Sequence, residues 1–346
     1  MAAAVNRVRS RLVRETDPRR EGQDQGRIKH PLGWDKNEDP LWRWGDEFRN
    51  QAVMSDLNWR FAVQDRCLWF LDRSTDSGLV VRFAESMRLT PLDGGGRYRW
   101  YDEQADKVLR TAVQREDRLP EILAQAADIM PFFYNLTGLD PRLARFTANL
   151  LNIAQMWATP LIMAMKNQVA LLRPYMVSSR IVPVIETPAH GSLPSGHATV
   201  SSLVSALLRS LIYRDTLDLQ SSQLSHPKVL QLDRLARRIA FNRVVAGVHF
   251  PMDSAAGYAL GLQMAAHLVG LAGDSGRQPV RFDPFDPAVN AHKEAIELSE
   301  DGLPKVPRQI DWLSSPMVTV SDPWRQMWLA ACKELETLGL RARTGP

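Results

Sequence analysis

The residues best suited to chemistry lie around one short turn, Pro194-Ser195-Gly196-His197. Basic residues precede this turn, and an arginine, a histidine and an aspartate follow it: Lys166, Arg173, Arg243, His249 and Asp253. Arginine offers a planar fork of donors, and lysine offers a point charge. A helix that begins at the Ser-Gly pair would add free backbone N–H groups and a positive dipole end. Such a set would suit a pocket for a tetrahedral oxyanion.

Each of these segments has an ordinary structural explanation when it is taken alone. A Pro-Ser-Gly triplet often opens a helix, and two basic residues seven positions apart often share a solvated helix face. A His-x-x-x-Asp pair often makes a structural hydrogen bond. Here the three segments occur together, in the order Lys-x6-Arg-Pro, Pro-Ser-Gly-His and Arg-x5-His-x3-Asp. The combination is much more specific than any of its parts.

This ordered pattern resembles that of the superfamily which joins type 2 phosphatidic acid phosphatases (PAP2), bacterial class A acid phosphatases and vanadium-dependent haloperoxidases. The resemblance covers residues 145–272, and we recognise none outside this span. It implies a helical bundle of the PAP2/vanadium haloperoxidase type, with residues 145–272 as its catalytic core.

The resemblance also implies a role for each motif residue around an anion of phosphate or vanadate shape. The cations that would neutralise the anion's oxygens are Lys166, Arg173 and Arg243, and the groups that would donate to it are Ser195 and the Gly196 N–H. His249 resembles the vanadate ligand of a haloperoxidase or the phosphorylated nucleophile of a phosphatase. Asp253 would hold the other ring nitrogen of His249 and fix its tautomer. His197 resembles the general acid–base of either enzyme.

His190 favours the haloperoxidase branch. It lies seven residues before His197, as a histidine does in the His-Pro-x-Tyr-Pro-Ser-Gly-His segment of seaweed-type vanadium bromoperoxidases. Vanadium chloroperoxidases tend to carry phenylalanine at that offset. A second histidine near the halide would suit oxidation of bromide or iodide. The sequence departs from the bromoperoxidase pattern at Gly191 and Leu193, and the alternative is an ordinary loop histidine.

We therefore predict a vanadium-dependent haloperoxidase that binds orthovanadate and uses hydrogen peroxide to oxidise bromide or iodide to hypohalous acid. His197 would move the proton, Lys166 would polarise the bound peroxide, and a small organic molecule could accept the halogen. The alternative is a phosphatase of the same fold that acts through a phosphohistidine at His249. A non-catalytic anion-binding relative is disfavoured because no motif position is missing.

Composition restricts the class of protein further. The 346 residues include 43 basic and 39 acidic side chains, a near balance that gives no argument for a nucleic-acid partner. Two distant cysteines, Cys67 and Cys332, form no disulfide framework, and the N-terminus lacks the apolar region of a secretory signal. We therefore expect a cytoplasmic protein. The uncharged runs 147–165 and 254–273 contain polar residues, which favours buried helices over membrane insertion.

The apolar spacing predicts a mostly α-helical bundle whose helix ends carry the motif residues. One helix should begin at Asp140-Pro141, run to about Leu172 and hold Lys166 and Arg173 on one face. Ser195 should cap the next helix, to about Tyr213. A helix over 228–245 should deliver Arg243. A break at Gly247 would then let Arg243 and His249 converge, and Pro251 should open the last core helix.

The chain divides into three parts by composition. Residues 1–45 form a polar arm whose tryptophans would anchor it on the body or on a second subunit of a homo-oligomer; the alternative is a partly disordered tail. Residues 46–275 form the helical-bundle domain, and 276–346 a C-terminal helical extension. Within the domain we expect a weak helix over 46–71, a short strand at 79–83, and helices over 101–115 and 119–136. In the extension we expect helices over 287–299 and 323–340.

Overall fold

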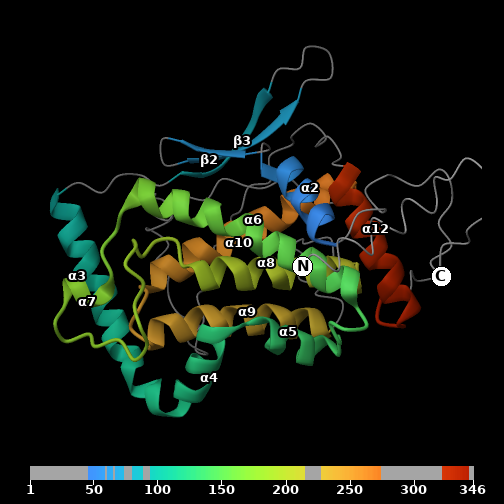
Figure 1. Ribbon diagram of the computed structural model, residues 1–346. Helices are drawn as coiled ribbons and strands as arrows, with labels where there is room; N and C mark the ends of the chain where they lie inside the picture. Colours follow the sequence, from blue (N-terminus) through green and yellow to red (C-terminus); the bar gives the residue numbers. More distant parts are fainter. Residues whose placement is uncertain are drawn as a thin grey trace, which may run out of the picture. The chain divides into compact units, whose positions relative to one another are not determined.

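The computed structural model describes residues 46–58, 61–64, 67–73, 80–88, 94–214, 227–273 and 322–342. The chain divides into the units Met1–Gly45 and Asp46–Pro346, and every described residue lies in the second. This part of the chain is mostly α-helical, which confirms the predicted fold class (Figure 1). The expected arm over 1–45 and the expected helix over 287–299 lie outside the described residues.

The described chain begins with a helix and a small antiparallel sheet. Helix α2 is Asp46–Asn58, and the strands are β1 Phe61–Gln64, β2 Cys67–Arg73 and β3 Val80–Arg88, paired in the order β1-β2-β3. Phe61 pairs with Phe70, and Cys67 pairs with Arg88. The helix expected over 46–71 is therefore wrong beyond residue 58, because runs rich in aromatic and branched residues favour strands. The strand expected at 79–83 is confirmed and extends to residue 88.

Two long helices and one short helix follow the sheet. Helix α3 is Gly94–Thr111, a 3₁₀ turn covers Ala112–Gln114, α4 is Arg115–Ala127, and α5 is Met130–Thr137. The helix expected over 119–136 is thus two helices, with Pro131 in the first turn of the second, where its missing N–H costs no hydrogen bond. Helices α4 and α5 both pack against α9.

Helix α6, Arg145–Val169, carries Lys166, and the four-residue helix α7, Pro174–Val177, follows Arg173. Two expectations are wrong here. The Asp140 carboxylate accepts the Arg142 N–H and closes a separate turn, so α6 begins five residues later than Asp140. At the other end Ala170 takes a left-handed conformation with φ +48°, so α6 stops before Arg173. Lys166 and Arg173 therefore lie on different elements.

The core of the bundle is α8, Gly196–Tyr213, with α6, α9 (Pro227–Val245) and α10 (Pro251–Leu271) packed around it (Figure 1). Helix α8 is buried along almost its whole length. Two glycines let α10 approach it closely, since a Cβ at Gly257 would overlap the Ser195 carbonyl and one at Gly261 would overlap the Thr199 carbonyl. This contact fixes the starts of α8 and α10 side by side.

Helix α12, Asp322–Thr337, packs against α6, α2 and α8 and confirms the helix expected over 323–340. Its Trp324 Nε1 donates to the Leu268 carbonyl at 2.7 Å. Its Glu334 carboxylate accepts the N–H groups of Phe146 and Thr147, at 2.9 and 2.8 Å. No helix among the described residues is long and apolar enough to cross a membrane.

Candidate functional site

The structure brings the motif residues together from the ends of five helices. Lys166 lies in the last turn of α6, Arg173 just before α7, Ser195 at the start of α8, Arg243 in the last turn of α9, and Asp253 in the first turn of α10. All five side chains are buried. The break at Gly247, with φ +79°, reverses the chain between α9 and α10, as the sequence predicts. The site is therefore assembled by packing rather than by any one segment.

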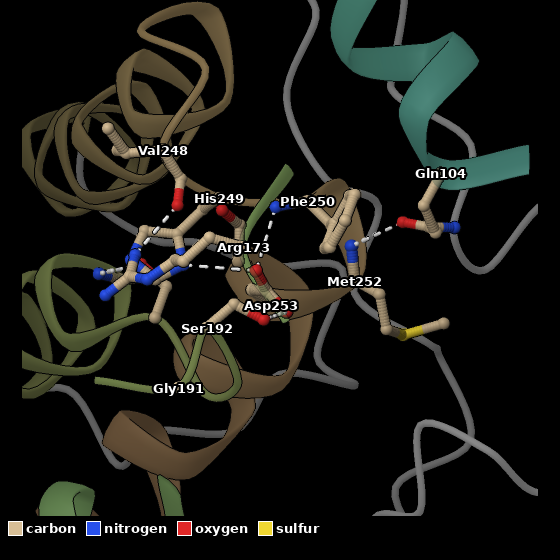
Figure 2. Close-up of polar contacts among 12 residues, drawn as sticks. Gln104, Arg173, Gly191, Ser192, Val248, His249, Phe250, Met252 and Asp253 are labelled. Carbon is tan, nitrogen blue, oxygen red and sulfur yellow. Dashed lines mark hydrogen bonds and ion pairs between the residues drawn. The ribbon is translucent and has the colours of Figure 1, made fainter. Parts of the chain in front are cut away.

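His249 lies between a carboxylate and a guanidinium (Figure 2). Its Nδ1 is 3.1 Å from Asp253 Oδ2, and its Nε2 is 3.1 Å from Arg173 Nη1. Because an arginine can only donate, Nε2 must accept from it, and the ring proton must be on Nδ1 and point to Asp253. Burial and the charges of Lys166 and Arg173 hold the pKa of His249 well below its usual value. The imidazole is thus neutral, with a nitrogen lone pair among cations.

Asp253 is fully buried and held by three groups. Its Oδ2 accepts the Phe250 N–H at 2.8 Å in addition to the His249 contact, and its Oδ1 lies 3.4 Å from the Ser192 hydroxyl (Figure 2). Burial raises the pKa of Asp253 to about 7. The carboxylate therefore both caps α10 and orients the imidazole of His249.

Arg173 makes four contacts, two to backbone carbonyls and two to histidine rings. Its Nε donates to the His190 carbonyl at 3.0 Å, and its Nη1 donates to the Val248 carbonyl at 2.8 Å. Its Nη2 lies 3.1 Å from His190 Nδ1. That nitrogen must accept from Arg173, so it cannot also donate to the Gly191 carbonyl, which lies at the same distance. Burial lowers the pKa of His190, and the ring is neutral and half-buried beside Arg173.

Lys166 is anchored by backbone rather than by a carboxylate. Its Nζ donates to the carbonyls of Gly191 and Ser192, each at 2.9 Å. These contacts use two of the three ammonium hydrogens. Burial, together with the charge of Arg173, lowers the pKa of Lys166 to about 7.

Arg243 has buried donors that no described residue satisfies. Its Nη2 donates to the Ile122 carbonyl at 2.9 Å and to Gln125 Oε1 at 3.4 Å. Its Nε and Nη1 are buried and have no hydrogen-bond partner among the described residues. Burial lowers the pKa of Arg243 to about 10. Unpaired buried donors on a cation are costly, and an oxyanion beside them would remove the cost.

His197 is half-buried and touches α4. Its Nε2 lies 3.2 Å from the Gln125 carbonyl, which can only accept, so Nε2 carries the proton and Nδ1 is the basic nitrogen. Burial and the charges of Arg243 and Lys166 lower the pKa of His197 to about 4. At neutral pH the ring is therefore an unprotonated base.

The start of α8 supplies backbone donors, as the sequence predicts. Ser195 Oγ accepts the Ala198 N–H at 3.4 Å, which confirms Ser195 as the helix cap, and the Ser195 N–H donates to the Asp253 carbonyl at 2.9 Å. A Cβ added to Gly196 would have no neighbour nearer than Ile162 Cγ2, at 4.0 Å. The helix therefore begins beside open space.

Residues 147–277 match the family model of the PAP2 superfamily. The match supports a PAP2 superfamily core. That superfamily contains phosphatases and haloperoxidases, and its members are generally enzymes. No curated protein matches the chain.

A PAP2-type oxyanion, phosphate or vanadate, suits this donor set. The charges of Lys166, Arg173 and Arg243 all act on His249, and Arg243 has two donors, Nε and Nη1, without a partner among the described residues. When bound, the anion would be held by the side chains of Lys166, Arg173, Arg243, Ser195 and His249 and by the Gly196 N–H.

Sequence reasoning missed two residues of this site, Ser192 and Gln125. Ser192 lies between His190 and the helix cap Ser195, where no pattern distinguishes it. Gln125 left a weak signal, because it lies three residues after Ile122 and so interrupts the apolar stripe of its helix with a polar side chain. Its role depends on the packing of α4 against α9, which no local pattern reveals.

Proposed function

We propose that this protein is a vanadium-dependent haloperoxidase, which would bind orthovanadate and use hydrogen peroxide to oxidise bromide or iodide. The proposal depends on two observations at the same site: His249 is neutral, and Arg243 has donors without a partner among the described residues. A nitrogen lone pair can bind the central atom of the anion, while the cations neutralise its oxygens.

One feature favours oxidation of halide over hydrolysis of a phosphate ester, and it is the position of His190. His190 contacts Arg173 through its Nδ1 and lies seven residues before His197, the offset at which seaweed-type bromoperoxidases carry a histidine. Its neutral ring would place a polar group beside the site for the incoming halide.

Each residue of the site would have its own role in the reaction. Asp253 holds the ring proton of His249 on Nδ1, so that Nε2 carries a lone pair. Nε2 would bind the anion after its hydrogen bond to Arg173 Nη1 breaks. Lys166, Arg173 and Arg243 would balance the negative charge, and His197 Nδ1 would take and return the proton. Bound vanadate would supply Lewis-acid activation of hydrogen peroxide. A small organic molecule could accept the oxidised halogen.

A paired assay on purified apoprotein tests this function. One half receives vanadate, hydrogen peroxide, bromide and a dimedone-type acceptor; the other receives a nitrophenyl phosphate without vanadate. We expect vanadate-dependent bromination, abolished in His249→Ala and retained in Leu143→Ala, whose side chain is 66% exposed. Phosphate release that vanadate suppresses, without bromination, would overturn the proposal and make His249 a nucleophile.

A separate substitution tests whether His190 influences the choice of halide. His190→Phe removes the Nδ1 contact to Arg173 and introduces the residue that chloroperoxidases tend to carry. We expect the ratio of bromide to chloride oxidation to fall in this variant, while vanadate affinity changes less than threefold, or about 0.6 kcal/mol. An unchanged halide ratio would show that His190 is an ordinary loop histidine.

A further inference from the structure

Gln125 lies on α4, outside the segment 147–277 that matches the family model, yet it contacts two motif residues. The residue is fully buried. Its backbone carbonyl accepts from His197 Nε2 at 3.2 Å, and its side-chain Oε1 lies 3.4 Å from Arg243 Nη2. One residue thus joins the acid–base histidine to a cation of the anion site.

The Gln125 amide is held in one orientation by its neighbours. Its Nε2 donates to Glu121 Oε1 at 2.7 Å, and its Oε1 accepts from Asn242 Nδ2 at 2.9 Å. An amide flip would set donor against donor at Asn242, whose own Oδ1 accepts from Arg118 at 3.0 Å. Glu121 is anchored in turn by Arg238, with contacts of 2.6 to 2.9 Å.

This orientation decides which donors of Arg243 are used. The Gln125 oxygen and the Ile122 carbonyl both accept from Nη2, which leaves Nε and Nη1 without partners among the described residues. Both acceptors are neutral. They hold the guanidinium without cancelling its charge, whereas a carboxylate at the same place would form an ion pair with it.

We propose that Gln125 is a positioning residue of the anion site. Its backbone carbonyl fixes the proton of His197 on Nε2, so that Nδ1 is the base, and its side chain orients Arg243 through a neutral acceptor, which leaves Nε and Nη1 for an incoming oxyanion. The inference rests on the oxyanion site described above but not on which reaction that site catalyses, since a haloperoxidase and a phosphatase both need a charged Arg243.

The substitution Gln125→Glu tests the charge argument, because it keeps the shape of the side chain and adds one negative charge, while it also removes the donor to Glu121. We expect the affinity of the apoprotein for vanadate, measured by titration calorimetry, to fall at least about tenfold, or 1.4 kcal/mol. We also expect the pKa of His197, measured by NMR, to rise, since a nearby carboxylate favours the charged imidazole. Gln125→Met adds no charge and keeps the backbone carbonyl that contacts His197, so it should leave the pKa of His197 at its wild-type value.

The matched control is Gln155→Glu, the same change on α6, where the side chain donates to the Leu151 carbonyl of its own helix and contacts no motif residue among those the structure describes. We expect it to bind vanadate as the wild type does. Gln125→Met is a second variant, neutral and without the Oε1 acceptor. We expect it to fold and to lose affinity, but less than Gln125→Glu, because only the orientation of Arg243 is lost.

The outcomes separate this inference from the proposed function. Wild-type affinity and an unchanged His197 pKa in Gln125→Glu would overturn it. If that variant fails to fold, wild-type affinity in Gln125→Met would overturn it. If the wild type binds neither vanadate nor phosphate, the proposed function fails, and the tautomer of His197, measured in the wild type by the NMR shifts of its ring nitrogens, still decides whether the Gln125 carbonyl holds the proton on Nε2.

Discussion

Arg173 Nη1 and His249 Nε2 meet at 3.1 Å inside the bundle, and both side chains are buried. The contact joins the donor of a permanent cation to the lone pair that a phosphorus or vanadium atom would need. It therefore keeps His249 in its reactive tautomer and also competes with the ligand for the same nitrogen. Bound anion would replace this contact by one between Arg173 and an anion oxygen.

We predict that Arg173→Lys weakens anion binding by more than tenfold, or about 1.4 kcal/mol. Lysine cannot contact His249, the Val248 carbonyl and the His190 carbonyl with one fork of donors. Vanadate titration of the apoprotein measures the effect. Leu172→Ala, at an exposed neighbouring position, is the control. Equal affinities of Arg173→Lys and the wild type would contradict the assigned role.

The low pKa of His197 predicts a pH-dependent stability. The folded protein binds a proton at His197 only near pH 4, whereas the unfolded chain binds one near 6.5. Between these values the unfolded state holds more protons, so this histidine lowers the free energy of unfolding as the pH falls from 6.5 to 4. Urea unfolding should show the wild type losing more stability over this range than His197→Gln. Parallel curves for the two proteins would argue against a depressed pKa.

Substitution by alanine should affect stability at Gly257 and anion binding at Gly196. Gly257→Ala places a Cβ against the Ser195 carbonyl, and we expect it to lower the free energy of unfolding by about 1–3 kcal/mol, as overpacking does. Gly196→Ala meets no atom within 4.0 Å except Ile162 Cγ2, so its stability should match the wild type. If the anion lies in that open space, vanadate affinity should fall about tenfold in Gly196→Ala. Unchanged affinity would place the anion elsewhere.

Glu334 on α12 should stabilise the start of α6, which is distant from it in the sequence. Its carboxylate accepts the Phe146 and Thr147 N–H groups and the Thr147 hydroxyl, at the start of α6, where Ala144 offers no side-chain cap. We expect Glu334→Ala to lower the free energy of unfolding by about 1–3 kcal/mol, because buried donors lose their acceptor. Chemical denaturation measures it. Lys333→Ala, on the exposed face of the same helix, should cost far less.

Local rules in the sequence are sufficient to predict the helix starts that carry the site. Ser195 caps α8, and Pro251 opens α10 with Asp253 in its first turn, because a cap and a first-turn proline act within a few residues. The reversal at Gly247 follows from the same kind of rule, since a positive φ suits glycine. These three features bring His249 beside Asp253.

Tertiary packing decides what the sequence could not predict. Helix α6 ends at an alanine in a left-handed conformation, for which the sequence carries no signal, so Lys166 and Arg173 separate onto two elements. The sheet replaces a weak helix beyond residue 58 because pairing between strands outweighs helix propensity there. Gln125 and Ser192 join the site only through helices and loops that are distant in the sequence.

The contact between Glu334 and the start of α6 also has a consequence for the order in which the chain is made. A ribosome synthesises Thr147 long before Glu334, so the nascent bundle must wait with the first N–H groups of α6 uncapped. The same holds for the Leu268 carbonyl, whose partner Trp324 emerges later. Translation that stalls before α12 would therefore leave a bundle with its motif residues present but the start of α6 without its acceptor.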